Sequence, residues 1–498
     1  MTLSSTFAII NSAFASTGAQ SAVISSNISN VNSTGYVREI ANQVTNSYGG
    51  SEVVSISRQA NVALLDQLNT STSESAAQTA ISTGLSTLAQ TVNDSSSATS
   101  ASGAKQSGNS PSAMLGNLQS ALATYQAAPS STASAQAVVT AAQNLTSSLN
   151  SGSQAVSSVQ EQADQNMATS VSTINTLLGQ FQKADSAIVS GLSSGADVSQ
   201  PEDTRDSILT QLSQQLGIST TTNTNGSMSI YTDSGVTLFQ DTAHTVSFTP
   251  TATYTATTVG NGVSVDGIPI TGSSAPMAIQ SGALAGYSQL RDTIAPNYQS
   301  QLDQIAGGLI SDFAEVSQSG SSPTLPGLFT TSSLTSVPSV TASAGLAASI
   351  EVNPNVVPSQ SGSLSLLRDG SISSPGNSDY TYNTTGAASY TGRIQQMVDS
   401  LTTTQSFDPS AGLGSSNNLT SYASDSVSWL QGQNQTATDA ASYQTSVVSQ
   451  ASAALSNATG VNLDTEMTNM LNIENSYSSS AKLLTTVNSM YQALLNAA

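Results

Sequence analysis

The sequence predicts a mainly α-helical protein with inserted β modules. We expect paired N- and C-terminal coiled-coil helices, an elongated helical-bundle shell, and one or more outer β domains. Three observations lead to this fold class. Apolar residues recur at steps of three and four at both ends, long amphipathic stretches fill the interior, and two segments with strand and turn signals interrupt them. Steps of three and four keep side chains on one helix face, and their average of about 3.5 is the coiled-coil repeat.

The two ends carry matching helical seams. The N-terminal seam is Leu3, Phe7, Ile10, Phe14, Thr17, Ser21, Ile24, Ile28 and Val31, and the C-terminal seam is Met467, Met470, Glu474, Tyr477, Ala481, Leu484, Asn488, Tyr491 and Leu495. Each seam extends over about 42 Å of helix, so we expect the two helices to lie together. The predicted subunit interface consists of Leu3, Phe7, Ile10, Phe14, Ile24, Ile28, Val31, Met467, Met470, Tyr477, Ala481, Leu484, Tyr491 and Leu495.

The C-terminal helix carries a second apolar row beside its seam, formed by Ile473, Leu483, Val487, Met490 and Leu494. Its apolar face is therefore wider than a two-helix seam requires. Either this is an ordinary amphipathic helix packed on its own domain, or neighbouring subunits cover the extra surface. Polar residues at seam positions weaken an isolated pair. We therefore expect residues 1–40 and 460–498 to be mobile in the monomer and to order on assembly.

The elements follow in the order helix, strand, helix. The N-terminal helix ends near Gly35, and residues 51–57 predict a short strand. Helical patterns then cover 62–92, 111–125, 133–192 and 201–216, with a Ser- and Gly-rich loop at 94–110. Pro201 and the acidic residues after it suit a helix start, and Arg205 is expected to pair locally with them.

After these helices, apolar and polar residues alternate, which is the pattern of β-strands. Residues 218–270 carry strand signals with hairpin turns at Asn225-Gly226 and Asn261-Gly262. Helical spacing returns at 281–317, 386–404 and 417–495, and residues 320–380 predict further β structure. The expected domains are a terminal helical domain (1–40 with 460–498), a helical-bundle domain (41–217 with 276–319 and 381–459), a β domain (218–275) and a second β-rich segment (320–380).

Composition excludes several classes of function. Nine Lys and Arg stand against 29 Asp and Glu, for a net charge of −20, so a nucleic-acid site built on clustered cations is not expected. The chain has no cysteine, which excludes disulfides and thiolate metal sites. We identify no apolar run long enough for a membrane span and no Sec-type signal peptide.

No residue pattern indicates catalysis. His244 is the only histidine, and a lone histidine is usually structural. Zinc and iron sites, nucleophile elbows and phosphate-binding glycine loops are missing from the sequence. We therefore predict a protein that is not an enzyme and that needs no catalytic residue, metal or cofactor. A carboxylate pair among the 29 acids remains an alternative that sequence cannot remove.

Two terminal motifs carry a family resemblance. Residues 27–36, NISNVNSTGY, resemble the N-terminal motif of bacterial flagellar rod, hook and hook-associated proteins, through Asn27, Asn30, Asn32, Gly35 and Tyr36. Ser29 and Ser33-Thr34 depart from the family pattern. Near the other end, Asn462, Leu463 and Asp464 resemble the matching C-terminal motif. The helical interior, including 171–181 and 281–309, is similar to the flagellar hook-associated protein 1 family.

The resemblance implies a structural role. It implies a ring of self-associating subunits at the hook–filament junction, outside the cell, exported through the flagellar type III apparatus. Implied partners are further copies of the chain, the hook protein, a second junction protein of the hook-associated protein 3 type, and an export chaperone. Two alternatives stay open: another axial subunit (hook protein or flagellin-like), or a secreted adhesin or enzyme with a site in the β region.

Overall fold

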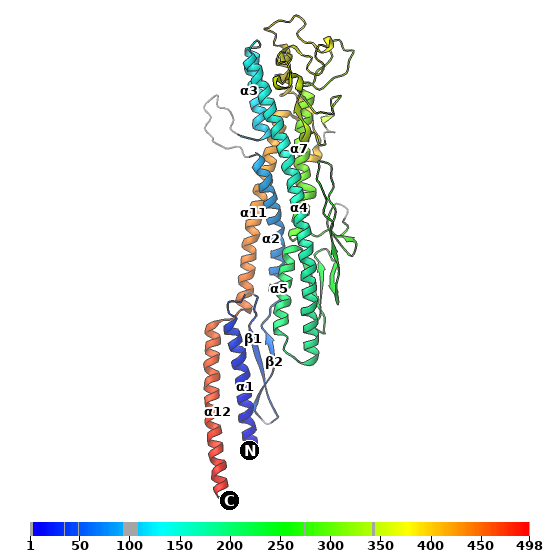
Figure 1. The fold of residues 1–498 in the computed structure, drawn as a ribbon. Helices are drawn as coiled ribbons and strands as arrows, with labels where there is room; N and C mark the ends of the chain where they lie inside the picture. The colour runs from blue at the N-terminus through cyan, green and yellow to red at the C-terminus, as the bar shows by residue number, and fades with distance from the viewer. Residues whose placement is uncertain are drawn as a thin grey trace.

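The protein is a long rod in which both chain ends lie at the same pole (Figure 1). The computed structural model describes residues 3–33, 35–47, 49–92, 108–272, 275–340 and 344–497. Most of the predicted loop at 94–110 lies outside the described residues. Long helices form the rod, and small antiparallel sheets lie at its side and at its lower part. The predicted fold class is thus confirmed, whereas the division into domains stays a prediction.

The lower part of the rod contains the two terminal helices and one β-hairpin (Figure 1). These elements are α1 (Leu3–Ser29), β1 (Glu39–Thr45), β2 (Ser51–Arg58) and α12 (Leu463–Ala497). The two strands are antiparallel, with a bulge between Asn42 and Gln43. The sequence predicted β2 but not β1.

The shell above them consists of long helices that run along the rod. They are α2 (Val62–Ala89) with the short η1 (Gln90–Val92), α3 (Pro111–Ala127), α4 (Thr132–Ser194), α5 (Ser199–Gln215), α6 (Ala283–Gln289), η2 (Leu290–Ile294), α7 (Ala295–Asp312) and α11 (Leu419–Thr459). Helix α2 packs along α11, while α4 packs against α3, α5 and α7. With 63 residues, α4 is about 95 Å long.

Side-chain caps explain where these helices begin. Asn61, Ser110, Ser131 and Asn418 each precede a helix and accept a hydrogen bond from a backbone N–H in its first turn. Such caps satisfy donors that have no partner within the helix. Gly195 ends α4 with a φ of 71°, a conformation that favours glycine.

A π-helical turn, η2, separates α6 from α7. Here the Ala295 N–H donates to the carbonyl of Leu290. Pro296 follows at once; it has no N–H, and its ring would clash with the carbonyl four residues earlier. A wider turn relieves this conflict. The turn also carries Arg291, whose side chain is fully buried.

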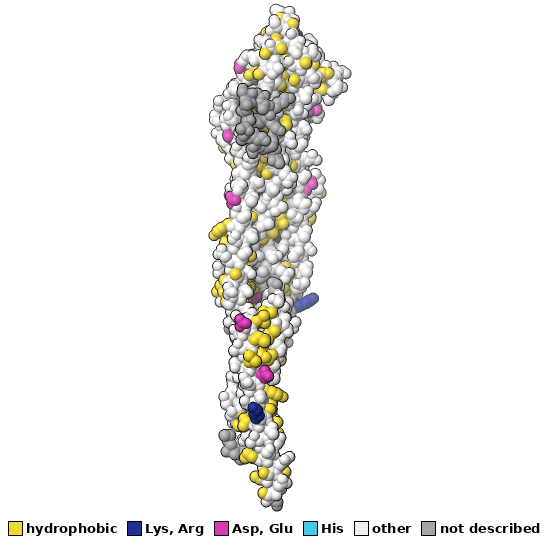
Figure 2. Space-filling view, turned by 90° about the vertical axis from the view of Figure 1, so that its left-hand side faces the viewer, with side chains coloured by type: hydrophobic (Ala, Val, Ile, Leu, Met, Phe, Trp, Pro, Cys, Tyr) yellow, Lys and Arg dark blue, Asp and Glu magenta, His cyan; other side chains and the backbone are white. Residues whose placement is uncertain are grey.

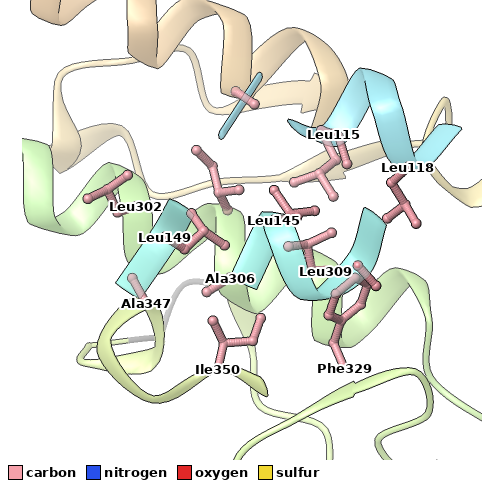
Figure 3. Packing of buried hydrophobic residues seen from close by; sticks show 14 of the residues in the cluster. Leu115, Leu118, Leu145, Leu149, Leu302, Ala306, Leu309, Phe329, Ala347 and Ile350 are labelled. Carbon is pink, nitrogen blue, oxygen red and sulfur yellow. The ribbon is translucent and has the colours of Figure 1, made fainter. Parts of the chain in front are cut away.

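Two apolar clusters fill the shell, and α4 contributes to both. In the upper cluster, Leu145 and Leu149 of α4 lie between α3 and α7 (Figure 3). The labelled partners around them are Leu115, Leu118, Leu302, Ala306, Leu309, Phe329, Ala347 and Ile350. In the lower cluster, α4 packs against α5 and the β region. There Phe181 and Phe239 meet edge to face, with ring centroids 4.9 Å apart.

The first β region forms two antiparallel sheets against α4. One contains β3 (Ile218–Thr222), β4 (Met228–Thr232), β5 (Thr237–Gln240) and β6 (Thr242–Ala243), and the other β7 (Val246–Ser247), β8 (Ser264–Val265) and β9 (Ile268–Pro269). Asn225-Gly226 forms the turn between β3 and β4, as the sequence predicts. The second hairpin turn is Asp266-Gly267, with both residues at positive φ. Asn261-Gly262 instead precedes β8, and the Asn261 carbonyl accepts a hydrogen bond from the Arg291 guanidinium.

Residues 320–380 contain much less strand than the sequence suggests. The regular elements from there to α11 are β10 (Phe329–Thr330), α8 (Leu346–Ser349), β11 (Glu351–Val352), η4 (Pro354–Val356), η5 (Pro358–Gln360), α9 (Leu366–Asp369), η6 (Ser378–Tyr380), α10 (Gly392–Ser400), β12 (Thr404–Ser406), η7 (Pro409–Ala411) and β13 (Ser416–Asn418). Proline and glycine keep each apolar run too short for a sheet. The runs supply single buried side chains, such as Ile350 and Leu367, to the upper cluster.

Two carboxylates on α7 lie within the shell, Asp303 buried and Asp312 half-buried. Asp303 accepts hydrogen bonds from the backbone N–H groups of Gly345 and Ala347 and from Gln299. Asp312 accepts one from the Gln405 amide at 3.0 Å. Burial raises the pKa of Asp303 to about 6 and that of Asp312 to about 7, because loss of water disfavours the charged form.

Replacing Leu145 by Ala should destabilise the shell. Leu145 is fully buried in the upper cluster, so we expect a loss of about 2–5 kcal/mol in the free energy of unfolding. Leu192→Ala on the same helix is the control, because Leu192 is 49% exposed and should cost no more than about 0.5 kcal/mol. Urea unfolding followed by circular dichroism measures both; equal effects would contradict the assigned core.

The half-buried Asp312 should make the free energy of unfolding depend on pH. The pKa of Asp312 in the folded state is raised above its ordinary value, so the folded state binds this proton more tightly than the unfolded state. The resulting contribution to the free energy of unfolding is complete below about pH 4 and is lost as the pH rises through about 7. Asp312→Asn should therefore be more stable than the parent at pH 8. Its free energy of unfolding should also change less with pH between about pH 4 and pH 7 than that of the parent. Asp439→Asn, at an exposed position of α11, should leave the profile unchanged. A parent-like profile for Asp312→Asn would refute this assignment.

Candidate assembly interface

The two terminal helices pair in antiparallel orientation. Phe14 and Tyr477 meet edge to face with ring centroids 5.0 Å apart, and the Ser21 hydroxyl lies 3.8 Å from the Met470 sulfur. Moving up α1 by seven residues thus moves back along α12 by seven. Figure 1 shows the same arrangement, with the N- and C-termini together at the lower pole.

The predicted interface residues of α1 differ in burial. Ile10 and Ile24 are buried, Phe14, Ile28 and Val31 are half-buried, and Phe7 is exposed. The side chain of Leu3 lies outside the described residues. Helix α1 therefore turns one side toward α12 and the hairpin and leaves Phe7 open near its beginning.

On α12, fewer of the predicted residues face α1. Met470, Ala481 and Leu484 are half-buried, while Met467, Tyr477, Tyr491 and Leu495 are each more than half exposed. Val487 is the buried apolar residue of this helix, and it belongs to the second row. The side of α12 that meets α1 is thus rotated from the predicted seam, toward Ile473 and Val487.

A set of large apolar side chains on α12 remains exposed to solvent in the single chain. We call it the open face; its members are Leu463, Met467, Leu471, Leu483, Met490, Tyr491, Leu494 and Leu495. Tyr477 is also 55% exposed, although its ring contacts Phe14. Figure 2 shows hydrophobic side chains gathered over the lower third of the rod on this side. A helix that is apolar around most of its circumference is usually covered on several sides, and α1 covers one.

By length and composition alone, one helix of the described chain could cross a membrane. It is the segment Ser4–Ser29 of α1, in which 28% of the most apolar window is buried. Core helices of soluble proteins pass the same test. Pairing with α12 and the hairpin covers part of α1, and the expectation that the chain does not span a membrane stays untested.

The N-terminal motif forms a hydrogen-bonded clamp at the top of α1. Asn27 is 1% exposed. Its amide donates to the carbonyl of Glu39 and accepts from the Glu39 N–H, both at 2.9 Å, and the Tyr36 hydroxyl also donates to it at 2.9 Å. Asn27 thus joins the end of α1 to the start of β1. Gly35, at a φ of 83°, allows the turn between them.

The other motif residues have local roles or are exposed. Asn30 donates to the carbonyl of Ser26 and accepts from Ser33, while Asn32 is exposed. Asn462 precedes α12 and accepts from the Thr465 N–H. Leu463 and Asp464 are exposed in the first turn of α12, where an acid is favourable beside the helix N-terminus.

Arg38 links the terminal elements to one another. Its guanidinium Nε lies 2.6 Å from Glu466 of α12, and its Nη1 donates to Gln59 at 3.1 Å. The Arg38 N–H donates to the carbonyl of Thr459, and its own carbonyl accepts from the Gln59 N–H. The Glu466 side chain is 1% exposed. A buried carboxylate needs such a partner, because its charge has lost its water.

Arg58 makes the second link, between the hairpin and the shell. Its guanidinium lies 2.6 Å from Asp203 and 2.7 Å from Asp206, at the start of α5. Burial raises the pKa of Asp203 to about 6 although Arg58 opposes this. Arg205, which the sequence suggested would pair within its helix, instead contacts Asp185 of α4 at 3.3 Å. That expectation was wrong because helix packing brings the buried Asp185 within reach of Arg205, while the local Asp203 and Asp206 pair with Arg58.

The geometry offers no chemistry that resembles catalysis in the part of the chain that is described. There, no group of three or more His, Asp or Glu residues could hold a metal ion. His244 lies 2.6 Å from Asp266 on the outer β region, and this hydrogen bond lowers the pKa of the exposed Asp266. A groove of about 680 Å³ between α2, α4 and α6 has no carboxylate, cation or histidine among its lining residues.

Sequence reasoning missed the arginine links. The sequence pattern does not distinguish Arg38, Arg58 or Glu466 from other charged residues. One signal was available: the chain has six arginines in 498 residues. Each of the six makes a described contact with another residue's oxygen. In a chain with so few cations, each arginine is a candidate structural link.

The terminal helices pair below a long helical shell, and much of the apolar surface of α12 stays exposed. Residues 103–324 match the family described as flagellar hook-associated protein FlgK helical domain, and residues 452–497 match the flagellar basal body rod FlgEFG protein C-terminal family. These matches confirm the predicted resemblance to the flagellar hook-associated protein 1 family over the two matched segments.

Other comparisons add little. No curated protein matches the chain. A structure of the flagellar hook junction protein FlgK from Burkholderia pseudomallei is similar at 20% identity and a TM-score of 0.41. The similarity covers 53% of this chain and 46% of that one. The chain thus spans about half the length of that relative, and so partial a likeness supports no conclusion about function.

Loss of the Asn27 side chain should weaken the clamp. Asn27→Ala leaves the buried Glu39 backbone groups and the Tyr36 hydroxyl without this partner, so we expect a cost of about 1–3 kcal/mol. Asn32→Ala, in the same motif but exposed, should be nearly neutral. Hydrogen exchange of the Glu39 amide and thermal unfolding measure the two variants. Equal protection in both would show that the clamp does not hold β1.

Proposed function

We propose that the chain is a non-catalytic subunit that joins the flagellar hook to the filament as a ring of self-associating copies. The observation that carries the proposal is the open face of α12, which belongs to the segment matched to the rod and hook family. The match to the FlgK helical domain favours the junction over other positions along the axis.

The composition of the terminal helices suits burial between copies. Helix α1 has no charged residue, and α12 has four: Asp464, Glu466, Glu474 and Lys482. Desolvating such helices costs little, whereas burying unpaired charges costs several kcal/mol each. Residues of the open face, such as Leu471, Leu483 and Leu494, would then pack against α1 or α12 of neighbouring copies.

The remaining parts of the proposal follow the family. Export through the flagellar type III apparatus would deliver the chain outside the cell, to the hook–filament junction. The hook protein would lie on one side of the ring and a second junction protein of the hook-associated protein 3 type on the other. An export chaperone would bind the chain before assembly.

Two alternatives are less well supported. A hook protein or flagellin-like subunit would share the terminal helices, but the FlgK-type match covers the helical interior. A secreted adhesin or enzyme would need a site in the β region, and the described groove lies in the shell and lacks catalytic side chains. We therefore propose a structural role without catalysis.

Charges placed in the terminal pair should block assembly. Ile24 is buried and Leu484 half-buried, and the double variant Ile24→Asp, Leu484→Asp puts unpaired charges among apolar groups. We expect the shell to fold, with a normal helical circular-dichroism signal, while filament subunits are shed into the medium. The control carries Ser25→Asp and Thr485→Asp at exposed positions of the same helices.

The function itself is tested by deleting the gene. Electron microscopy should then show hooks without filaments. Normal filaments on cells that lack the whole protein would overturn the functional assignment. Normal filaments on cells with only the Ile24→Asp, Leu484→Asp variant would overturn the interface alone.

A further inference from the structure

The terminal part of the rod is connected to the shell by a thin joint. The chain crosses it three times, at 30–38, 59–61 and 460–462. Among the regular elements, β2 against α5 provides the main contact across it. In the described part of the chain, neither apolar cluster includes a residue of these three crossings, although Val37 and Val461 lie within them. Polar contacts of defined geometry must therefore fix the angle between the two parts.

Arg38 contacts all three crossings. It lies at the end of the first and bonds through its backbone to Gln59 in the second and to Thr459 beside the third. Its guanidinium bonds Gln59 again and Glu466 of α12. Gln59 in turn donates to the carbonyl of Ala458 at 3.2 Å. Arg38 is thus the centre of a hydrogen-bond network that joins the end of α11 to the start of α12.

The charge of Arg38 favours one position of α12, the one in which Glu466 lies beside the guanidinium. Glu466 is buried in the first turn of α12, and the Arg38 guanidinium together with the helix N-terminus compensates its lost hydration. A swing of α12 away from α11 would separate the two charges. Arg58 restrains the other side of the joint through Asp203 and Asp206, so bending is resisted on both sides.

We infer that the Arg38–Glu466 pair is a positioning element that sets the angle between the terminal helices and the shell. The consequence for assembly rests on the proposed function: copies in a ring must present their open faces at one common angle. Ring symmetry repeats one interface, so a variable angle within the subunit would prevent closure. Arg38 would then act on assembly without contacting the neighbouring copy.

The angle can be measured directly because the chain has no cysteine. Ser449→Cys in α11 and Ser476→Cys in α12 place spin labels at exposed positions on either side of the joint. We expect a narrow distance distribution in the otherwise unchanged chain. Arg38→Gln should broaden and shift it, and so should Glu466→Gln. The double variant should be no worse than either single one, since the two act as a pair.

Arg368→Gln is the matched control. Arg368 also pairs with an adjacent acid, Asp369, but belongs to α9, in the yellow part of the chain near the opposite pole (Figure 1). It should leave the distribution narrow, and circular dichroism should show that all variants keep their helices. If a helix-retaining Arg38→Gln variant gives the narrow distribution of the parent, the inference is wrong.

A cellular experiment separates this inference from the proposed function. Cells with only Arg38→Gln should shed filament subunits, whereas Arg368→Gln cells should keep filaments. If deletion of the whole protein leaves filaments intact, the proposed function fails while the spin-label result still decides the role of the pair. If deletion removes filaments but Arg38→Gln cells keep them, the angle does not control assembly.

Discussion

One continuous helix holds the shell together. Helix α4 contributes side chains to both apolar clusters, Leu145 and Leu149 to the upper one and Phe181 to the lower one. A helix is stiff along its axis because every backbone hydrogen bond lies within it. The orientation of the upper loops relative to the outer β region is therefore set by α4. The elements packed on it can be short and irregular, since their apolar side chains meet a surface that is already formed.

Scarce positive charge is concentrated where segments meet. Arg291 in the π-helical turn contacts Asp164 of α4 at 2.6 Å and the Asn261 carbonyl of the β region. Arg393 lies over the Tyr382 ring and donates to the carbonyls at the end of α7. With several donors in a fixed plane, a guanidinium can bind acceptors from separate segments at once. These links give a chain with thin apolar cores defined angles between its parts.

The terminal helices follow a different principle. Their own pairing leaves half of α12 uncovered, and the exposed side chains are large and apolar, such as Leu471 and Leu494. In a finished monomer such a surface would favour aggregation. In a subunit that assembles, the same surface supplies the driving force, while the buried Asn27 clamp and the Arg38–Glu466 pair keep it oriented. Stability within the chain and association between chains thus use separate sets of residues.

The sequence alone determined the long helices, because their periodic apolar residues and their capping Ser and Asn are local signals that packing reinforces. It also identified the terminal pair, the turn at Asn225-Gly226 and the family motif. It could not determine which side of α12 meets α1, since apolar residues such as Ile473 and Met467 occur on both sides. It suggested too much strand at 320–380, and it did not reveal the partners of Arg38, Arg58 or Arg205. Those pairs join residues up to 428 positions apart, and only the tertiary structure decides them, because a buried charge pairs with whichever opposite charge packing brings within reach.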